Sequence, residues 1–225
     1  MDSVSSILVV SPHPDDETFG CGGTLARFGR SNVVLHVAFV TDGAASHPGH
    51  PIVGPSELAV RRTAEAFKAA QALGIEAKNL RFLGEHDGTL ARLSPAEADN
   101  AVKSISGLVE ELCPAAILMP CRSDGSSEHD AVFSLVSRAL RQAGRHPRIL
   151  EYPVWSWWNP LRLLSPLLSC RRVWRVDVAN VLALKANAMS AYSSQLLPIP
   201  PDTAAALPLG FDSMFQSFDE FLFEW

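Results

Sequence analysis

Residues 13–17 read His-Pro-Asp-Asp-Glu, which places an imidazole beside three carboxylates. They follow an unbroken apolar run, Ile7–Val10, that is typical of a strand buried on both faces. Prolines on either side of His13 prevent the strand from continuing. Where this loop enters a helix, the side chains of His13 and Asp16 can turn toward one point, with Asp15 between them. Imidazole nitrogen and carboxylate oxygen are ligands of catalytic zinc, which takes about three protein ligands and keeps a position for water.

A second segment with metal-binding side chains lies at residues 124–130, Asp-Gly-Ser-Ser-Glu-His-Asp. It follows another apolar run, 115–119, which a proline closes. In parallel α/β sheets, ligands bind at the edge formed by the carboxyl ends of the strands. We therefore expect His129 to join His13 and Asp16 there as the third ligand of a metal ion. The alternative is that Asp16 only caps a helix and that both histidines are solvated.

Such a site would carry the chemistry of amide hydrolysis. A divalent metal polarises an amide oxygen and lowers the pKa of its bound water toward neutrality. Asp15, adjacent to the ligands but not one of them, can accept the proton of the water and return a proton to the leaving amine. Glu128, Asp130 or Asp124 could hold the second ring nitrogen of His129.

With these residues the chain resembles the PIG-L or LmbE-like zinc-dependent de-N-acetylases, whose hallmark near the amino terminus is (A/S)-H-P-D-D-E. The resemblance covers nearly the whole chain up to the tail, through the segments 41–43, 61–65, 83–88, 124–130 and 185–195. It implies a Zn²⁺ ion held by His13, Asp16 and His129, with Asp15 as the general base. It also implies substrate contacts at Asp87 and at Arg61 or Arg62.

One position departs from the family pattern. The second element of the family usually reads D-x-H-x-D-H, and its first histidine helps to polarise the carbonyl group or to protonate the leaving group. This chain has Ser126 at that position and Glu128 in place of the second aspartate. We expect the metal site to survive the change. Either a histidine from a neighbouring loop, His86, His47 or His50, supplies the proton, or the chemistry is slower or different.

Strand-like and helix-like segments alternate along the chain, as in parallel β-α-β units. The predicted strands are 7–10, 33–40, 79–83, 115–119, 148–154 and 171–176, and the predicted helices are 17–30, 57–73, 97–112, 130–143 and 178–192. No domain boundary is visible, and 225 residues suffice for one doubly covered sheet. We therefore expect a single α/β domain over residues 1–225, with a Rossmann-like, mostly parallel sheet flanked by helices.

Aromatic side chains gather in two places. Residues 152–160 contain three of the five tryptophans, and because indole rings present flat apolar faces to a sugar ring, we predict that Trp157 contacts the substrate. The alternative is that these tryptophans belong to the core. The tail, about residues 198–225, repeats phenylalanine at short spacing, so we expect it to pack on the body or on a second subunit. Ser193 and Gln195, just before the tail, are expected to serve helix packing.

Composition excludes several classes of protein. A net charge of −5 without a Lys/Arg-rich run argues against a nucleic-acid partner. The four cysteines form no C-x-x-C pair and are expected to be reduced thiols. The amino terminus lacks a signal-peptide pattern, and no run of about 20 apolar residues could span a membrane. We expect a cytoplasmic protein that acts on a small molecule, as a monomer or a homo-oligomer.

The leading hypothesis is a zinc-dependent hydrolase that removes the acetyl group from an N-acetylated amino sugar or its conjugate. Two alternatives stay open. The first is another zinc-assisted reaction on the same scaffold, such as hydration of a small unsaturated acid. The second is a sugar-binding module that retains the metal. Metal content and acetate release distinguish the three.

Overall fold

The computed structural model describes residues 4–225. Its centre is strand β1 (Ser6–Ser11), which pairs in parallel with β2 (Val34–Thr41) on one side and with β4 (Ala116–Pro120) on the other. All of its residues after Ser6 are buried. This confirms the prediction that the apolar run before His13 is a strand covered on both faces.

Within residues 4–225 the sheet has seven strands, in the order β3-β2-β1-β4-β5-β7-β6. Strand β3 (Leu80–Glu85) lies at one edge, and β5 (Arg148–Tyr152) continues the parallel part beyond β4. Strand β7 (Asp219–Glu224) then runs antiparallel between β5 and β6 (Arg172–Asp177). The fold is thus the single, mostly parallel α/β sheet that the alternating pattern predicts.

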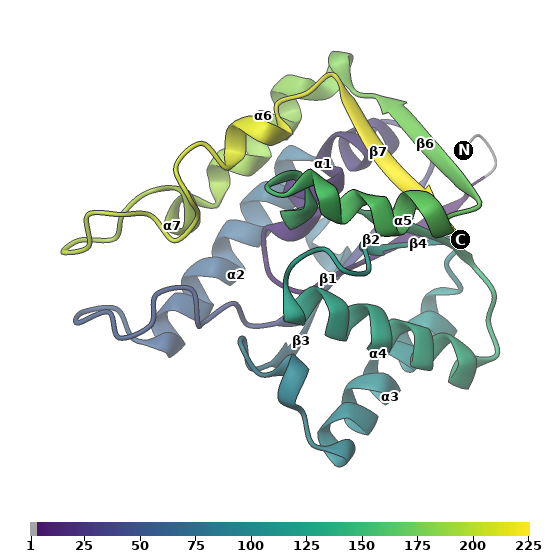
Figure 1. Cartoon of the computed structure of the whole chain (residues 1–225), viewed down its shortest axis with the longest axis horizontal. Helices are drawn as coiled ribbons and strands as arrows, with labels where there is room; N and C mark the ends of the chain where they lie inside the picture. The colour runs from purple at the N-terminus through teal and green to yellow at the C-terminus, as the bar shows by residue number, and fades with distance from the viewer. Residues whose placement is uncertain (1–3) are drawn as a thin grey trace.

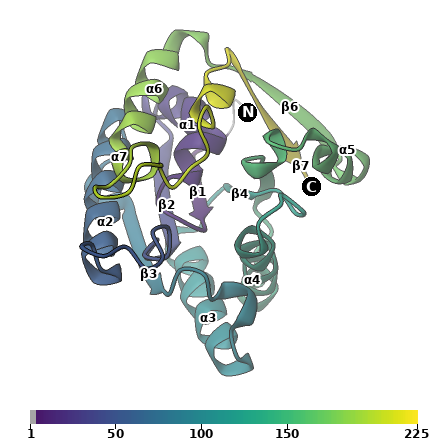
Figure 2. The ribbon, with the colours of Figure 1, turned by 60° about the vertical axis from the view of Figure 1, so that its left-hand side comes forward.

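Helices cover both faces of the sheet (Figures 1 and 2). One face packs on α1 (Asp16–Gly29), α2 (Pro55–Ala72) and α6 (Leu182–Ala191), and the other on α3 (Pro95–Leu112) and α4 (Ser127–Ala143). The alternation of side chains along β1 follows this division, because Ile7 and Val9 join the first core cluster and Leu8 and Val10 the second. The remaining α-helices are α5 (Leu164–Ser169) and α7 (Ser193–Leu196).

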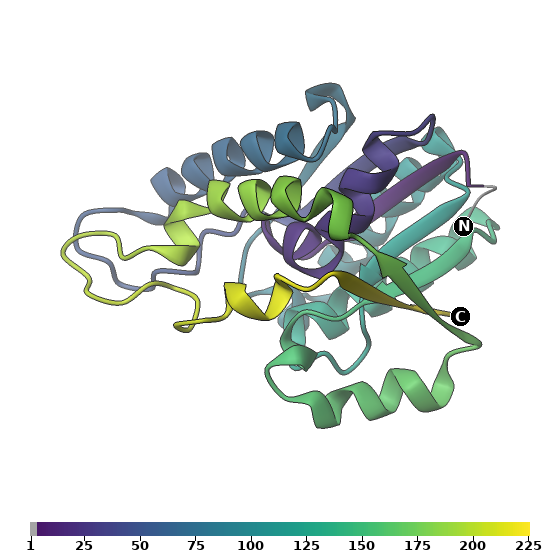
Figure 3. The ribbon, with the colours of Figure 1, turned by 90° about the horizontal axis from the view of Figure 1, so that it is seen from above.

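Short 3₁₀ helices fill several connections: η1 (Ala77–Asn79), η2 (Leu90–Arg92), η3 (Trp155–Trp157), η4 (Pro160–Leu163), η5 (Ala179–Val181) and η6 (Asp212–Phe215). The loop before α2 and the segment after α7 extend side by side (Figure 3), joined by a hydrogen bond of 3.1 Å between His50 Nε2 and the carbonyl oxygen of Ile199. Within residues 4–225, none of the helices combines the length and the apolar character that crossing a membrane would require.

Helix α1, which begins at Asp16, is kinked and closely packed. Its regular geometry breaks at Cys21, where φ is −143°. The freed backbone N–H groups of Gly23 and Thr24 donate to the two carboxylate oxygens of Glu220 on β7, at 2.8 and 2.7 Å. Strand β7 therefore holds α1 in place, and α1 positions Asp16 at the edge of the sheet.

Candidate functional site

A cavity of about 580 Å³ opens at the carboxyl ends of the parallel strands. Its wall includes His13, Asp15, Asp16, Arg62, Asp87 and Gln195. The first three come from the junction of β1 and α1, and Asp87 comes from the loop after β3. The structure therefore brings together, at one edge of the sheet, segments that are distant in the sequence.

The three predicted metal ligands lie around one point. His13 Nδ1 is 2.9 Å from Asp16 Oδ2, and His129 Nε2 is 3.3 Å from Asp16 Oδ1. A ligand atom of each residue lies within 4.8 Å of the others. His129 Nε2 is buried and, within the described chain, forms no hydrogen bond. A lone pair so placed, beside a carboxylate, fits a divalent cation.

Asp124 holds the other nitrogen of His129. Its Oδ2 lies 2.8 Å from His129 Nδ1, and the carboxylate also accepts the backbone N–H groups of Val154, Trp155 and Ser156. An acceptor at Nδ1 favours the tautomer that leaves Nε2 free to bind a metal. Of the three candidates from the sequence, Asp124 is therefore the residue that makes this contact.

The carboxylates determine the protonation of the two histidines in the absence of a cation. Burial opposes a charged ring, but Asp16 and Asp124 raise the pKa of His129 to about 9. Burial is likewise outweighed at His13, where hydrogen bonds that the ring donates to Asp16, Asp87 and Glu128 raise its pKa well above the ordinary value. For Asp16, burial is outweighed by His129 and His13, which hold its pKa far below its usual range. The site therefore has a strong electrostatic preference for positive charge at this point.

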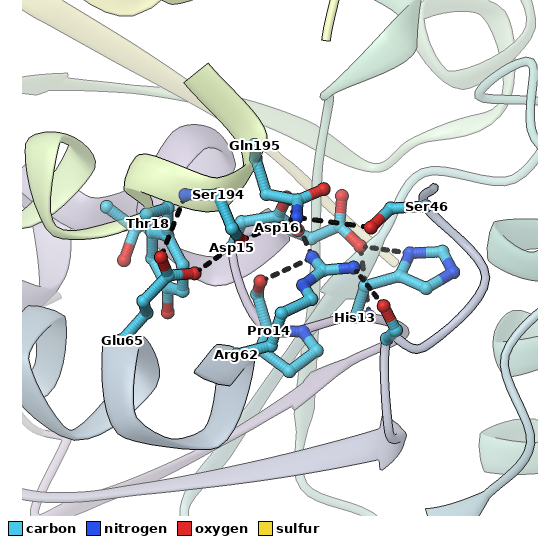
Figure 4. Close-up of polar contacts among 12 residues, drawn as sticks. His13, Pro14, Asp15, Asp16, Thr18, Ser46, Arg62, Glu65, Ser194 and Gln195 are labelled. Carbon is cyan, nitrogen blue, oxygen red and sulfur yellow. Dashed lines mark hydrogen bonds and ion pairs between the residues drawn. The ribbon is translucent and has the colours of Figure 1, made fainter. Parts of the chain in front are cut away.

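Asp15 faces the same cavity but contacts a different partner (Figure 4). Its Oδ2 lies 2.9 Å from Arg62 Nη2, and the same guanidinium donates to the carbonyl oxygens of Gly43 and Pro14. Asp15 has a φ of 151°, which residues with a side chain rarely adopt. Burial raises its pKa to about 7, against the opposing effect of Arg62. A carboxyl group with this pKa can both accept and donate a proton near neutral pH.

Asp87 and Glu128 approach His13 from the opposite side. Asp87 Oδ1 lies 3.1 Å from His13 Nε2, and its Oδ2 accepts the backbone N–H of Ala45. Burial would raise the pKa of Asp87, but the hydrogen bond with His13 lowers it. Glu128 Oε2 is 3.8 Å from the same nitrogen. Asp87 is thus held at the cavity wall as an acceptor.

Two of the predicted substrate contacts lie elsewhere. The side chain of Arg61 is at the surface, where it pairs with Glu57 at 3.6 Å, whereas its neighbour Arg62 lines the cavity. Trp157 packs against Phe221, with ring centroids 6.1 Å apart, and is not part of the cavity wall, whereas Trp155 is. Residues 155–157 form the 3₁₀ helix η3, and the two tryptophans face different surroundings.

The position of the family's additional histidine, Ser126, also lines the cavity. The three histidines considered as substitutes lie beside an adjoining cavity of about 440 Å³, which shares Ala45 and Asp87 with the first. His86 is mostly exposed, and His50 is bonded to Ile199. None of the three lines the larger cavity within residues 4–225.

Sequence reasoning did not identify Gln195 as a residue of this site. It lines the cavity from α7, where Glu65 of α2 accepts the backbone N–H of Ser194 at 2.8 Å. Because Glu65 and Ser194 are 129 residues apart in the chain, no local pattern around either one indicates their contact.

Comparisons with known proteins indicate a family of de-N-acetylases. The model of the GlcNAc-PI de-N-acetylase family, PIG-L, matches residues 8–140. A probable N-acetyl-alpha-D-glucosaminyl L-malate deacetylase 2 from Bacillus anthracis is 31% identical over 157 residues, which cover 68% of this chain and 67% of that protein.

Two solved structures show how widely the fold is shared. The N,N'-diacetylchitobiose deacetylase of Pyrococcus horikoshii superposes with a TM-score of 0.68 at 19% identity, covering 89% of this chain and 73% of that one. GalB, the 4-carboxy-2-hydroxymuconate hydratase of Pseudomonas putida KT2440, superposes with a TM-score of 0.71 at 14% identity, covering 98% and 95%. At these identities the likeness shows the fold alone, which therefore does not by itself distinguish hydrolysis from hydration.

Proposed function

The chain belongs to the PIG-L family of GlcNAc-PI de-N-acetylases. We propose that it is a zinc-dependent hydrolase that removes the acetyl group from an N-acetylated amino sugar or its conjugate. The observation that carries the proposal is the convergence of His13, Asp16 and His129 on one point, with Asp15 lining the same cavity as His13 and Asp16. Each of these residues matches the family motif. The name of the malate-conjugate relative supports a sugar carrying an N-acetyl group.

His13, Asp16 and His129 would hold the metal. Zinc, when bound, would supply a Lewis acid for the amide carbonyl and an acidified water molecule. The chain's own residues do the rest of the chemistry. Asp15, with a pKa raised to about 7 by burial against the effect of Arg62, accepts a proton from the attacking water and returns one to the amine nitrogen as the amide bond breaks. With Ser126 in place of an imidazole, Asp15 serves as both base and acid.

Other groups of the cavity would orient the sugar. Asp87, held by His13 and Ala45, presents carboxylate oxygens that can accept from sugar hydroxyls. Arg62 fixes Asp15 and borders the cavity, so we assign it the role that the resemblance left open between Arg61 and Arg62. Trp155, which lines the cavity where Trp157 does not, offers the aromatic face. The cytoplasmic location and any homo-oligomer stay predictions.

The test is acetate release combined with metal analysis. Purified protein is loaded with zinc and given a panel of N-acetylglucosamine conjugates that includes the malate conjugate and diacetylchitobiose. We expect about one zinc per chain and acetate from at least one substrate. Asp15→Asn should keep the metal and lower kcat by about 10²- to 10⁴-fold. His13→Ala should lose the metal, and His146→Ala, a change at an exposed histidine, should behave as the wild type.

A different result would favour one of the alternatives. Stoichiometric zinc without acetate from the whole panel would contradict the proposed hydrolysis. Under that outcome, addition of water to small unsaturated acids becomes the reaction to assay, since the same fold carries a hydratase in GalB. Failure to bind zinc in the wild type would contradict the proposed ligand set.

A further inference from the structure

Gln195 is a buried amide at the wall of the cavity. It lies on α7 (Ser193–Leu196), is only 2% exposed, and borders the same space as His13 and Asp15. Figure 4 shows its side chain reaching from α7 toward Ser46 and the His13–Asp16 segment. A side-chain amide has a donor end and an acceptor end, so its orientation determines what it can bind.

Glu65 and Ser194 set that orientation from one side. The hydroxyl group of Ser194 donates to Glu65 Oε2 at 2.7 Å, while Glu65 Oε1 accepts the backbone N–H of Ser194 at 2.8 Å. With its single hydrogen used on Glu65, Ser194 Oγ can only accept from Gln195, 2.8 Å away. The amide nitrogen Nε2 must therefore face Ser194, because the oxygen Oε1 in its place would have no hydrogen to accept.

Ser46 fixes the amide from the other side. Its Oγ lies 3.2 Å from Gln195 Nε2, in the loop that follows β2. Both hydrogens of the amide nitrogen are thus used by Ser194 and Ser46. The remaining polar atom, Oε1, has no hydrogen-bond partner among residues 4–225, and it is not among the fully buried atoms that lack one. It therefore keeps some exposed surface, on a residue that lines the cavity. Gln195 Oε1 is therefore a hydrogen-bond acceptor at the cavity wall, and Ser194 and Ser46 hold it in one orientation.

We propose that Gln195 is a specificity residue of this site, whose Oε1 accepts a hydrogen bond from a hydroxyl group of the bound amino sugar. The inference rests on the proposed deacetylase function and deepens it. A neutral acceptor held on both sides cannot rotate to offer a donor. A substrate without a hydroxyl at the matching position would leave Oε1 without this hydrogen bond in the complex, and that loss discriminates between sugars.

Mono-deoxy sugars test this directly. The probes are methyl 2-acetamido-2-deoxy-β-D-glucopyranoside and its 3-, 4- and 6-deoxy analogues, and the measurement is kcat and KM for acetate release. For the wild type we expect one analogue to fall about 3- to 10-fold in kcat/KM relative to the parent, mainly through KM. In Gln195→Met, which removes the acceptor at equal length, the parent should fall to the level of that analogue, so that the discrimination disappears.

Two further variants separate this role from a structural one. Ser194→Ala keeps Gln195 but releases its amide, and should lose part of the same discrimination. Gln71→Met, the same substitution at an exposed site on α2, should leave kcat/KM for the parent sugar and for its analogues unchanged. Zinc content and thermal unfolding are measured for each variant to establish that the fold and the metal site are intact.

The outcomes are distinct. If the wild type releases acetate and Gln195→Met discriminates among the analogues as the wild type does, the assignment of Gln195 is overturned while the proposed function stands. An equal loss on the parent and all three analogues also overturns it, because the contact would then involve a group other than a hydroxyl. If the wild type releases no acetate from any of these sugars, the proposed function is overturned, and the inference fails with it.

Discussion

The carboxylate of Asp124 connects the metal site to the chain after β5, since it binds both His129 and three successive backbone N–H groups. In Asp124→Asn, either orientation of the amide puts an NH₂ group against these donors. If it faces His129 Nδ1, the ring changes tautomer and Nε2 becomes protonated. We expect zinc affinity, measured by competition with a chelator, to fall about 10- to 100-fold, and the protein to lose about 1–3 kcal/mol of stability.

Asp130→Asn is the matched control, because Asp130 is exposed and, among residues 4–225, its carboxylate accepts only the backbone N–H of Ser123. Zinc affinity should be unchanged in that variant. Equal losses in the two variants would show that the contact between Asp124 and His129 does not orient the ring.

The raised pKa of Glu151, on β5, predicts that stability depends on pH at a place away from the metal site. It is fully buried beside Arg122, and burial raises its pKa from an ordinary value of 4.5 to about 7 against the effect of Arg122. Because the folded state holds this proton more tightly than the unfolded state, the stabilisation is complete below about pH 4.5 and is lost as the pH rises through about 7. This difference in pKa between the unfolded and folded states corresponds to about 3 kcal/mol in the free energy of unfolding.

Glu151→Gln cannot titrate, so it should lose this part of the pH dependence. Between about pH 5 and pH 8 we expect the free energy of unfolding of the wild type to fall by ~2–3 kcal/mol relative to the variant, as measured by urea denaturation. Parallel pH profiles would mean that Glu151 keeps an ordinary pKa.

At the scale of elements, helix α1 depends on the absence of a side chain at Gly20. A Cβ atom there would meet the buried ring of Tyr152, with Tyr152 Cε2 at 2.9 Å and another ring carbon closer still. Gly20→Ala should therefore destabilise the protein by about 1–3 kcal/mol through overpacking. Since the helix would have to move away from β5 and it begins at Asp16, we also expect weaker zinc binding.

Gly107, inside α3, provides the control because a Cβ atom there meets nothing within 4 Å. Gly107→Ala should leave the stability unchanged or raise it by up to about 1 kcal/mol. Thermal and urea unfolding of both variants measure the difference, and equal behaviour would contradict the close packing of α1 on Tyr152.

The sequence predicts most elements because their patterns are local. The apolar runs of β1, β2 and β4 and the periodicity of the main helices each lie within one segment. The meeting of His13 with His129 also follows, since both come after strands of a parallel sheet. Which of Arg61 and Arg62 faces inward does not follow, because neighbours on a helix differ by only about 100° and both are arginines. Strand β7 was not predicted either, since its partners β5 and β6 are far away in sequence.

At the scale of the whole molecule, Lys185 and Glu220 join three distant segments. Lys185 on α6 lies 2.6 Å from Glu220 on β7, whose carboxylate also binds the second half of α1, and both side chains are buried. Lys185→Met leaves a buried carboxylate without its cation, so we expect a loss of about 3–5 kcal/mol. The double variant with Glu220→Gln should lose less than the sum of the single variants.

Lys78→Met serves as the comparison, since the pair between Lys78 and Glu76 is largely exposed. It should change the free energy of unfolding by no more than about 1 kcal/mol. Additive effects of Lys185→Met and Glu220→Gln in urea unfolding would show that the two buried charges do not interact.

The order of the strands has a consequence for synthesis of the protein. Strand β7 is made after β5 and β6 but lies between them, and β6 pairs with no other strand among the described residues. While the chain emerges from the ribosome, residues 172–177 must wait for residues 219–224 before their backbone groups find partners. A nascent chain stalled in between would expose the unpaired edge of β5, which is the kind of surface that chaperones bind and that aggregates form on.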